Sequence, residues 1–313
     1  MRRYDFVKNR KYAFGFSIAM FVFFAIMLIV NGITLDISFK GGTRMMIETV
    51  GEVDPNKAGE LIEQAINKKV IASITKTYDA ASASATIDML RIDIAGNEPL
   101  TPEEEEQVKT IIAQNFPVKL ESEKNENVSI TPTIGRETLQ RGILAVIVSM
   151  VLILLYVAWR FSTLGGFSAA ACAIIALFHD VGVMFGVYIV FKLPLNDIFI
   201  ATILTVIGYS INDTVVVYDR IRENTVLMKK TDQGDIVNVS IHQSLSRSIN
   251  TLATTLICIV TLLIYSVSNN ISSLRDFSFS LLIGVITGVY STIFIASPLW
   301  LFWKERKQKA LVK

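Results

Sequence analysis

The sequence contains little that would support metal, redox or nucleotide chemistry. It has two cysteines and two histidines among 313 residues. Cys172 and Cys258 both fall within long apolar stretches, where a thiol is typically a small buried apolar side chain, and the spacing of His, Cys and carboxylate residues does not match a zinc site. A G-x-x-x-x-G-K-[ST] nucleotide-binding motif is absent as well. We therefore expect no metal, no cofactor and no ATP bound by this chain.

Charge is also scarce over long parts of the chain. Apolar residues make up 51% of the sequence and charged residues 19%, and the mean hydropathy is +0.48. The charges are distributed unevenly and leave six stretches nearly free of them, each long enough to cross a bilayer. The predicted spans are 12–31, 140–159, 165–191, 198–219, 247–268 and 277–303. This pattern predicts a polytopic α-helical membrane protein with six transmembrane helices.

The distribution of positive charge predicts how the spans are oriented. The first span follows a basic N-terminus and lacks a small-x-small cleavage signal, so we interpret residues 1–32 as a cytoplasmic N-terminus followed by an uncleaved anchor. The segment 220–246 and the tail 304–313 are basic too, and cytoplasmic segments are enriched in Lys and Arg. Both termini are therefore predicted in the cytoplasm. Within 220–246 we expect a short helix on the inner membrane surface.

Residues 33–139 form a long polar segment that is predicted to lie outside the membrane. It carries 11 Lys and Arg against 18 Asp and Glu, a net charge of −7. An N-cap Asp54 and a capping box at Thr101, each followed by Pro, predict the starts of two helices. Strands are expected at 43–50, 70–78, 85–94 and 117–131. The order β-α-β-β-α-β predicts an extracytoplasmic α+β ferredoxin-like domain, a fold that hosts many activities.

Asp213 lies in the otherwise apolar fourth span. A carboxylate there costs about 2.5–3.5 kcal/mol on insertion scales, so such a residue usually faces a polar interior and serves a function. Reversible protonation suits it, because the charge of a buried carboxylate responds to desolvation and to an approaching cation. The alternative is a structural Asp that is satisfied by Asn212, Thr214 or a neighbouring helix. We favour a proton pathway that contains Asp213 and the adjacent Asn212.

Two further charged residues interrupt the spans. Arg247 opens the fifth span at the inner side, at a depth expected to match that of Asp213. A buried Arg stays charged, which makes Arg247 the candidate electrostatic partner of a titrating Asp213. The alternative for Arg247 is a border residue that snorkels to the membrane surface. Asp180 follows His179 in the third span and is either a second relay position or a structural group.

Four segments of the sequence resemble the SecF family of protein-export membrane subunits, within the RND superfamily. They are V-I-G-Y-S-I-N-D-T-V-V-V-Y-D-R-I-R-E-N at 206–224, S-L-S-R-S-I-N-T-L-A-T-T at 244–255, A-L-F-H-D-V at 176–181 and I-S-F-K-G-G-T at 37–43. The last is similar to the family element I-D-F-x-G-G-T, although Ser38 stands where the family usually has Asp. The resemblance, including the number of spans and the outer domain after the first, covers essentially the whole chain.

The resemblance implies a fold, partners and an activity. The chain would form half of an RND-type bundle, pair with a SecD-like subunit that supplies the other six spans, and associate with the SecYEG channel in the inner membrane of a bacterium. The pair would use the proton-motive force to promote translocation or release of unfolded secretory proteins, without acting as an enzyme. Asp213 and Arg247 match positions in the family's proton pathway. Membrane lipids are expected as further partners, and nucleic acid is not.

Two other functions fit parts of the sequence. An RND-like proton-driven exporter of small molecules or lipids would use the same half-fold and carboxylate, and it would need an apolar substrate pocket. An intramembrane aspartyl protease would use Asp180 and Asp213 as a pair that shares a proton. The sequence Ser-Ile-Asn-Asp at 210–213 differs from the Gly-x-Gly-Asp motif of that class. Both alternatives remain open at this point.

Overall fold

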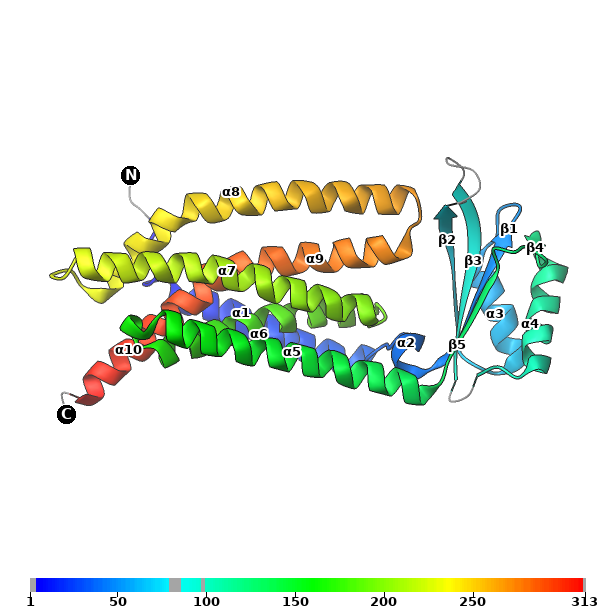
Figure 1. Ribbon diagram of the computed structural model, residues 1–313, viewed down its shortest axis with the longest axis horizontal. Coiled ribbons are helices and arrows are strands. Elements are labelled where there is room, and N and C mark those ends of the chain that lie inside the picture. The colour runs from blue at the N-terminus through cyan, green and yellow to red at the C-terminus, as the bar shows by residue number, and fades with distance from the viewer. Residues whose placement is uncertain (1–3, 79–85, 97–98, 312–313) are drawn as a thin grey trace.

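The computed structural model describes residues 4–78, 86–96 and 99–311. An elongated bundle of long helices carries a small α/β domain at one end, and both termini lie toward the other end (Figure 1). The helices of the bundle are α1 (Arg10–Asn31), α5 (Pro132–Arg160), α6 (Gly166–Val190), α7 (Asp197–Leu227), α8 (Gln233–Ser268) and α9 (Ser272–Ser291). A 3-10 turn, η1 (Ser162–Leu164), links α5 to α6, and α9 continues through a π-helical segment, η2 (Thr292–Ala296), into α10 (Ser297–Leu311).

The six predicted spans are confirmed. Six helical segments in the described chain are long and apolar enough to cross a membrane, and the last of them combines α9, η2 and α10 as far as Lys307. The chain is therefore a multi-pass membrane protein. The spans differ in how much of their surface the chain itself covers: α6 and the last span are mostly buried, whereas α1, α5 and α8 are largely exposed.

The prediction of a separate surface helix within 220–246 is wrong. The helix α7 continues to Leu227 and α8 begins at Gln233, so both membrane helices run on beyond their predicted inner ends and meet at a short turn. No Gly or Pro interrupts the sequence between Gly208 and Gly234, and the polar residues therefore continue the helices. Asn224 of α7 donates to Ser240 of α8 (2.8 Å), which holds the two extensions together.

The α/β domain has the ferredoxin-like arrangement that the sequence predicts. After its predicted side it is called the outer domain, the helix ends next to it are called outer, and the opposite ends are called inner. Its elements are β1 (Gly42–Thr49), α3 (Pro55–Ile66), β2 (Val70–Tyr78), β3 (Thr86–Ala95), α4 (Pro102–Asn115), β4 (Val118–Lys119) and β5 (Glu126–Ile130). The sheet order is β2-β3-β1-β4, β5 also pairs with β1, and every pairing is antiparallel. The last expected strand is thus split in two. The capping box of Thr101 and Glu104 is present, and α5 already begins at Pro132.

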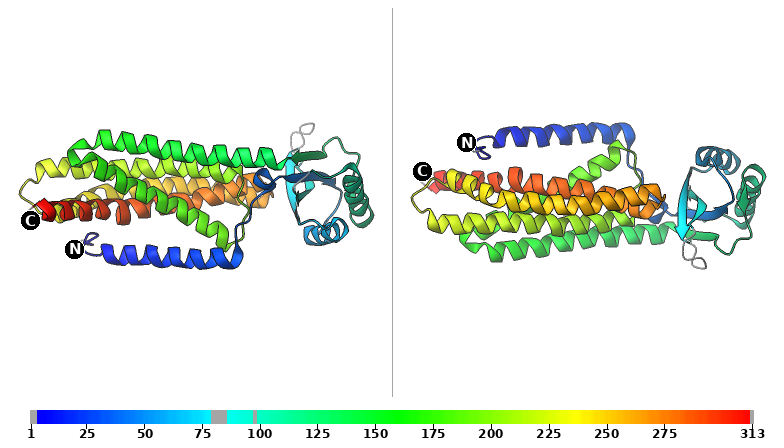
Figure 2. Two further views of the ribbon diagram at one scale, coloured as in Figure 1. Left: turned by 90° about the horizontal axis from the view of Figure 1, so that it is seen from below. Right: turned by 90° about the horizontal axis from the view of Figure 1, so that it is seen from above.

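The two faces of the sheet have different roles. The helices α3 and α4 cover the face that points away from the bundle (Figures 1 and 2). Met45 and Ile47 lie opposite Ile92 and Leu90 and are buried in the domain core with residues of α3 and α4. Because side chains alternate along a strand, the residues in between point toward the bundle. This places Arg44, Arg91 and Asp93 on the bundle-facing side of the sheet.

A charged cluster joins this sheet face to the link after α1. That link contains the short helix α2 (Ile37–Lys40), whose N-cap is Asp36. Asp36 accepts hydrogen bonds from Arg44 (3.1 Å) and Arg91 (3.3 Å), and both arginines also pair with Asp93. Ser38 donates its amide and its hydroxyl to Asp36 as well (2.9 and 2.8 Å). Ser38 therefore supports a carboxylate two residues earlier.

The charged cluster sets the protonation of Asp36. Burial alone would raise its pKa, but the hydrogen bonds from Ser38 and the positive charges of Arg44 and Arg91 outweigh this effect and lower the pKa below its ordinary value. A further tie to the bundle comes from the α8–α9 turn, where the carbonyl of Asn270 accepts from the amide of Lys76 (3.2 Å) and the hydroxyl of Thr75 (3.0 Å) in β2. The outer domain is thus fixed to several helices of the bundle.

Candidate functional site

Asp213 lies in the inner half of α7 and faces α8. Its Oδ1 accepts a hydrogen bond from the hydroxyl of Ser248 in α8 (2.6 Å). Its Oδ2 is shielded from solvent and has no hydrogen-bond partner in the described part of the chain. Arg247 is within electrostatic reach of Asp213 but forms no ion pair with it among the residues that the structure describes. One oxygen of this carboxylate is thus held by a neighbouring helix, and the other is buried without a partner.

Exposed polar and small residues lie close to this site along α7 and α8. On α7, Gly208 and Asn212 are exposed, and on α8 so are Arg247 and Asn250. The sequence left open whether the hydroxyls of α8 line a polar path or bond between helices. The hydroxyls of Thr251 and Thr254 are exposed and donate to carbonyls of α8 itself, so they do not join it to another helix of the described chain.

Asp180 occupies a different environment, in the centre of the bundle. Its side chain is 1% exposed, and its Oδ2 accepts from the hydroxyls of Ser210 in α7 (2.7 Å) and Ser291 in α9 (2.8 Å). Its Oδ1 lies 3.3 Å from Nδ1 of His179. The Nε2 of His179 lies 3.2 Å from the hydroxyl of Ser17 in α1. Asp180 therefore belongs to a buried network that joins α1, α6, α7 and α9.

The structure brings together Asp213 and Arg247 but not Asp213 and Asp180. The two carboxylates neither bond to each other nor share a hydrogen-bond partner in the described chain. A pair of carboxylates that share a proton, as an aspartyl protease needs, is therefore not formed here. Asn212 adjoins Asp213 in sequence, but its side chain is exposed and contributes no hydrogen bond to the carboxylate among the described contacts.

Sequence reasoning missed the hydroxyl groups that bind the two carboxylates. Ser248 follows Arg247 directly, and Ser210 lies one turn before Asp213 and Thr214. The serines lie 35, 30 and 111 residues from the carboxylates that they bind, so proximity along the chain gives no signal for these pairs. The spans are mostly apolar, and their sequences therefore give little information on which helix faces meet.

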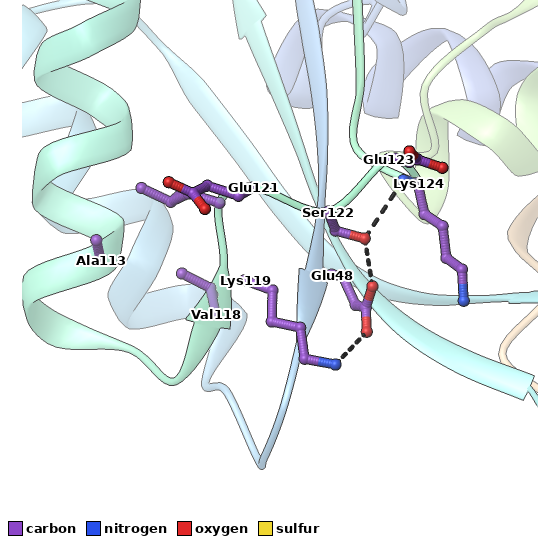
Figure 3. A pocket seen from close by; sticks show the side chains of 9 residues that line it. Glu48, Ala113, Val118, Lys119, Glu121, Ser122, Glu123 and Lys124 are labelled. Carbon is purple, nitrogen blue, oxygen red and sulfur yellow. Dashed lines mark hydrogen bonds and ion pairs between the residues drawn. The ribbon is translucent and has the colours of Figure 1, made fainter.

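Two hollows in the described chain lie away from these carboxylates. One, of about 720 Å³, opens beside β4 in the outer domain (Figure 3). There Glu48 accepts from Ser122 (2.5 Å) and Lys119 (2.9 Å), and these two hydrogen bonds lower the pKa of Glu48. Its central carboxylate is thus already satisfied within the domain.

The second hollow, of about 600 Å³, lies between the charged face of the sheet and the outer ends of α6, α8 and α9. The sheet contributes the charged residues Arg91 and Asp93. The bundle contributes the aromatic residues Tyr188, Phe191 and Phe279 and also the charged pair Arg275 and Asp276 of α9. Among the described residues, His, Cys, Asp and Glu form no group of three that could hold a metal ion.

Comparison with known proteins places the chain among export proteins. Residues 108–306 match the family model described as protein export membrane protein SecD/SecF, C-terminal. The chain is 35% identical over 312 residues to the protein translocase subunit SecDF of Bacillus subtilis. This match covers 98% of this chain and 39% of that protein. It is 35% identical over 309 residues to the protein translocase subunit SecF of Rhodothermus marinus, with 94% of this chain and 91% of that protein covered.

A solved structure gives the same result. The crystal structure of SecDF, a translocon-associated membrane protein from Thermus thermophilus, matches with a TM-score of 0.78 and 30% sequence identity. The match covers 97% of this chain and 39% of that chain. This chain thus spans about two fifths of the SecDF relatives and nearly the full length of the SecF relative.

Proposed function

The chain belongs to the SecD/SecF family of protein-export membrane proteins, and from this membership we propose that it is an accessory subunit of the Sec translocase driven by protons. Proton movement through Asp213 would promote translocation or release of unfolded secretory proteins at the outer face. The observation that carries this proposal is the Oδ2 of Asp213, which is buried within a membrane-spanning helix and has no partner in the described chain. A proton is the simplest ligand for such an atom.

The charges around Asp213 support a change of protonation there. Arg247 remains charged whatever the state of its neighbours, so it favours ionised Asp213, while burial favours the neutral form. A small movement of α8 relative to α7 changes the balance between these two effects. An inward proton supplies about 2.3 kcal/mol per 100 mV from the electrical term alone. Several protons therefore suffice for a domain movement worth a few kcal/mol.

The proton pathway requires a second set of helices. Asn212, Arg247 and Asn250 are exposed at membrane depth, and exposed polar groups there are normally covered by protein. The SecDF relatives are long enough to contain this chain and a larger second part. We propose that a SecD-like subunit covers this face, that the pair associates with the SecYEG channel, and that both termini lie in the cytoplasm. Lipids of the bacterial inner membrane would surround the rest.

One observation favours a second candidate, an RND-like exporter of small molecules or lipids. The hollow of about 600 Å³ at the outer ends of α6, α8 and α9 is lined by both aromatic and charged side chains, as an amphipathic substrate would require. Its position outside the membrane core, next to the outer domain, fits release at the outer face. Transport of such a molecule by the purified complex without the SecYEG channel would favour this candidate.

The proposal is tested by protein export in cells that carry Asp213→Asn as the sole copy. We expect a variant that still copurifies with its SecD-like partner but has lost the part of reporter release that depends on the proton gradient. Asp219→Asn is the matched control, because Asp219 lies on the same helix but pairs with Arg160 and Arg222 near the inner end. Normal gradient-dependent release by Asp213→Asn would contradict the proposal.

A further inference from the structure

Ser248 differs from most hydroxyl side chains in the spans. A serine or threonine within a helix commonly donates to a carbonyl three or four residues earlier, which satisfies the hydroxyl locally. Residues that do so include Ser149, Thr202, Thr205, Thr251, Thr261, Ser266, Ser278 and Thr287. Ser248 is 1% exposed and instead donates across to the carboxylate of Asp213 (2.6 Å) on a different helix.

This hydrogen bond makes the two oxygens of Asp213 unequal. Oδ1 is occupied by Ser248, whereas Oδ2 is buried and has no partner in the described chain. A carboxyl group that is held at one oxygen cannot turn freely, so its second oxygen keeps a fixed direction. The hydrogen bond also joins α7 to α8 beside Arg247.

We propose that Ser248 is a positioning residue that fixes the Asp213 carboxyl group so that Oδ2 is the atom that takes up and releases the proton. A proton that binds Oδ2 converts the carboxylate into a neutral carboxyl group, and its loss restores the charge. Ser248 keeps its own hydrogen and donates to Oδ1 in both states. The inference rests on the proposed function, since it concerns the same titrating carboxylate.

Within the described chain, Arg247 is the charged residue that acts electrostatically on Asp213. Several titratable groups on other helices that pack against α7 are engaged elsewhere. His179 and Asp180 of α6 bond to serines of α1, α7 and α9. Arg160 of α5 pairs with Asp219, Arg275 pairs with Asp276 at the outer end of α9, and Lys304 of α10 bonds to Gln233. A change at Ser248 therefore acts on Asp213 without disturbing another ion pair.

The test is an infrared titration of the Asp213 carboxyl band in the purified complex with the SecD-like partner. The band is identified by its absence in Asp213→Asn. We expect Ser248→Ala to move the titration midpoint by about one pH unit or more, because a hydrogen bond to a charged group contributes that much. Ser248→Thr retains the donor and should restore the native midpoint. Ser266→Ala is the matched control, since Ser266 is a buried serine of the same helix that bonds to its own backbone.

The outcomes separate this inference from the proposed function. A native Asp213 that does not titrate would overturn both. A native Asp213 that titrates, with the same midpoint in Ser248→Ala, would overturn the role of Ser248 and leave the proposed function intact. Should Ser248→Ala not assemble, Ser248→Cys keeps a similar volume with a much weaker donor, and an unchanged midpoint in that variant would overturn the inference equally.

Discussion

Asp180 and Asp213 both lie within membrane-spanning helices, but their surroundings are opposite. The carboxylate of Asp180 is buried, and both of its oxygens have partners on His179, Ser210 or Ser291. Asp213 lies where two helices meet an uncovered face of the bundle, and one of its oxygens has no partner in the described chain. Full hydrogen bonding favours a fixed structure, whereas an unsatisfied oxygen next to a charged Arg247 favours a change of state. We therefore propose a structural role for Asp180 and proton binding for Asp213.

The stability of an Asp180→Leu variant tests this difference between the two carboxylates most strongly. Removal of the carboxylate takes the acceptor from the buried hydroxyl of Ser210 and the partner from Nδ1 of His179, whereas Ser291 keeps the carbonyl of Gly288. Each buried polar group left without a partner costs about 1–3 kcal/mol. We expect a total loss of about 3–5 kcal/mol in the free energy of unfolding, measured as a lower melting temperature of the purified complex. Asp180→Asn keeps an acceptor oxygen and should lose less. Native stability in Asp180→Leu would contradict a structural role.

Asp36 extends the comparison to a carboxylate outside the membrane. Its side chain is 4% exposed and pairs with Arg44 and Arg91, so Asp36→Asn breaks a buried ion pair and should cost about 3 kcal/mol. Because the folded state lowers the pKa of Asp36, ionised Asp36 stabilises the fold above its unfolded pKa of about 3.9, and this contribution is lost as the pH falls through the folded value. The difference in the free energy of unfolding between the native protein and Asp36→Asn should thus be constant from pH 5 to 8.

Melting temperatures of both proteins, measured across that pH range and down toward pH 4, check the direction of the pKa shift of Asp36. A difference that grew as the pH fell would contradict the assigned direction. Glu48→Gln serves as the control, because Glu48 pairs with an exposed lysine and should contribute little, within about 1 kcal/mol.

The smallest expected effect on stability is that of Asp213→Leu. The oxygen Oδ2 has no partner to lose, and Ser248 can turn its hydroxyl to a carbonyl of its own helix, as other serines of the spans do. We expect the free energy of unfolding of the complex to fall by no more than about 1 kcal/mol or to rise, and the melting temperature reports this change. A loss as large as that of Asp180→Leu would show that Asp213 is also structural.

Much of the architecture follows from the sequence alone. The runs without charge predict the spans, and the caps at Asp54 and Thr101 together with the strand order predict the ferredoxin-like domain. The polar residues predict an end of the fourth span at 219 and a start of the fifth at 247, whereas α7 continues to Leu227 and α8 already begins at Gln233, because no Gly or Pro interrupts 209–233. A polar composition marks the end of the membrane and leaves the end of the helix undetermined.

The site could be predicted in part. Asp213 and Arg247 stand out because a charge in an apolar span is rare, and their depths follow from the direction of the helices. The hydroxyl groups that distinguish Asp213 from Asp180 could not be predicted. Helices that are mostly apolar give little signal for their rotation, so the contact of Ser248 with Asp213, or of Ser291 with Asp180, appears only in the folded chain.

Proton flux tests the central distinction most directly. The complex with the SecD-like partner would be reconstituted into vesicles, and proton entry under an imposed membrane potential would be followed with a pH-sensitive dye inside. The native complex, Asp213→Asn and Asp180→Asn would be compared at equal amounts of assembled protein. The account predicts that Asp213→Asn reduces the flux to that of protein-free vesicles, while assembled Asp180→Asn retains it. Native flux through Asp213→Asn, with flux lost in assembled Asp180→Asn, would contradict the account.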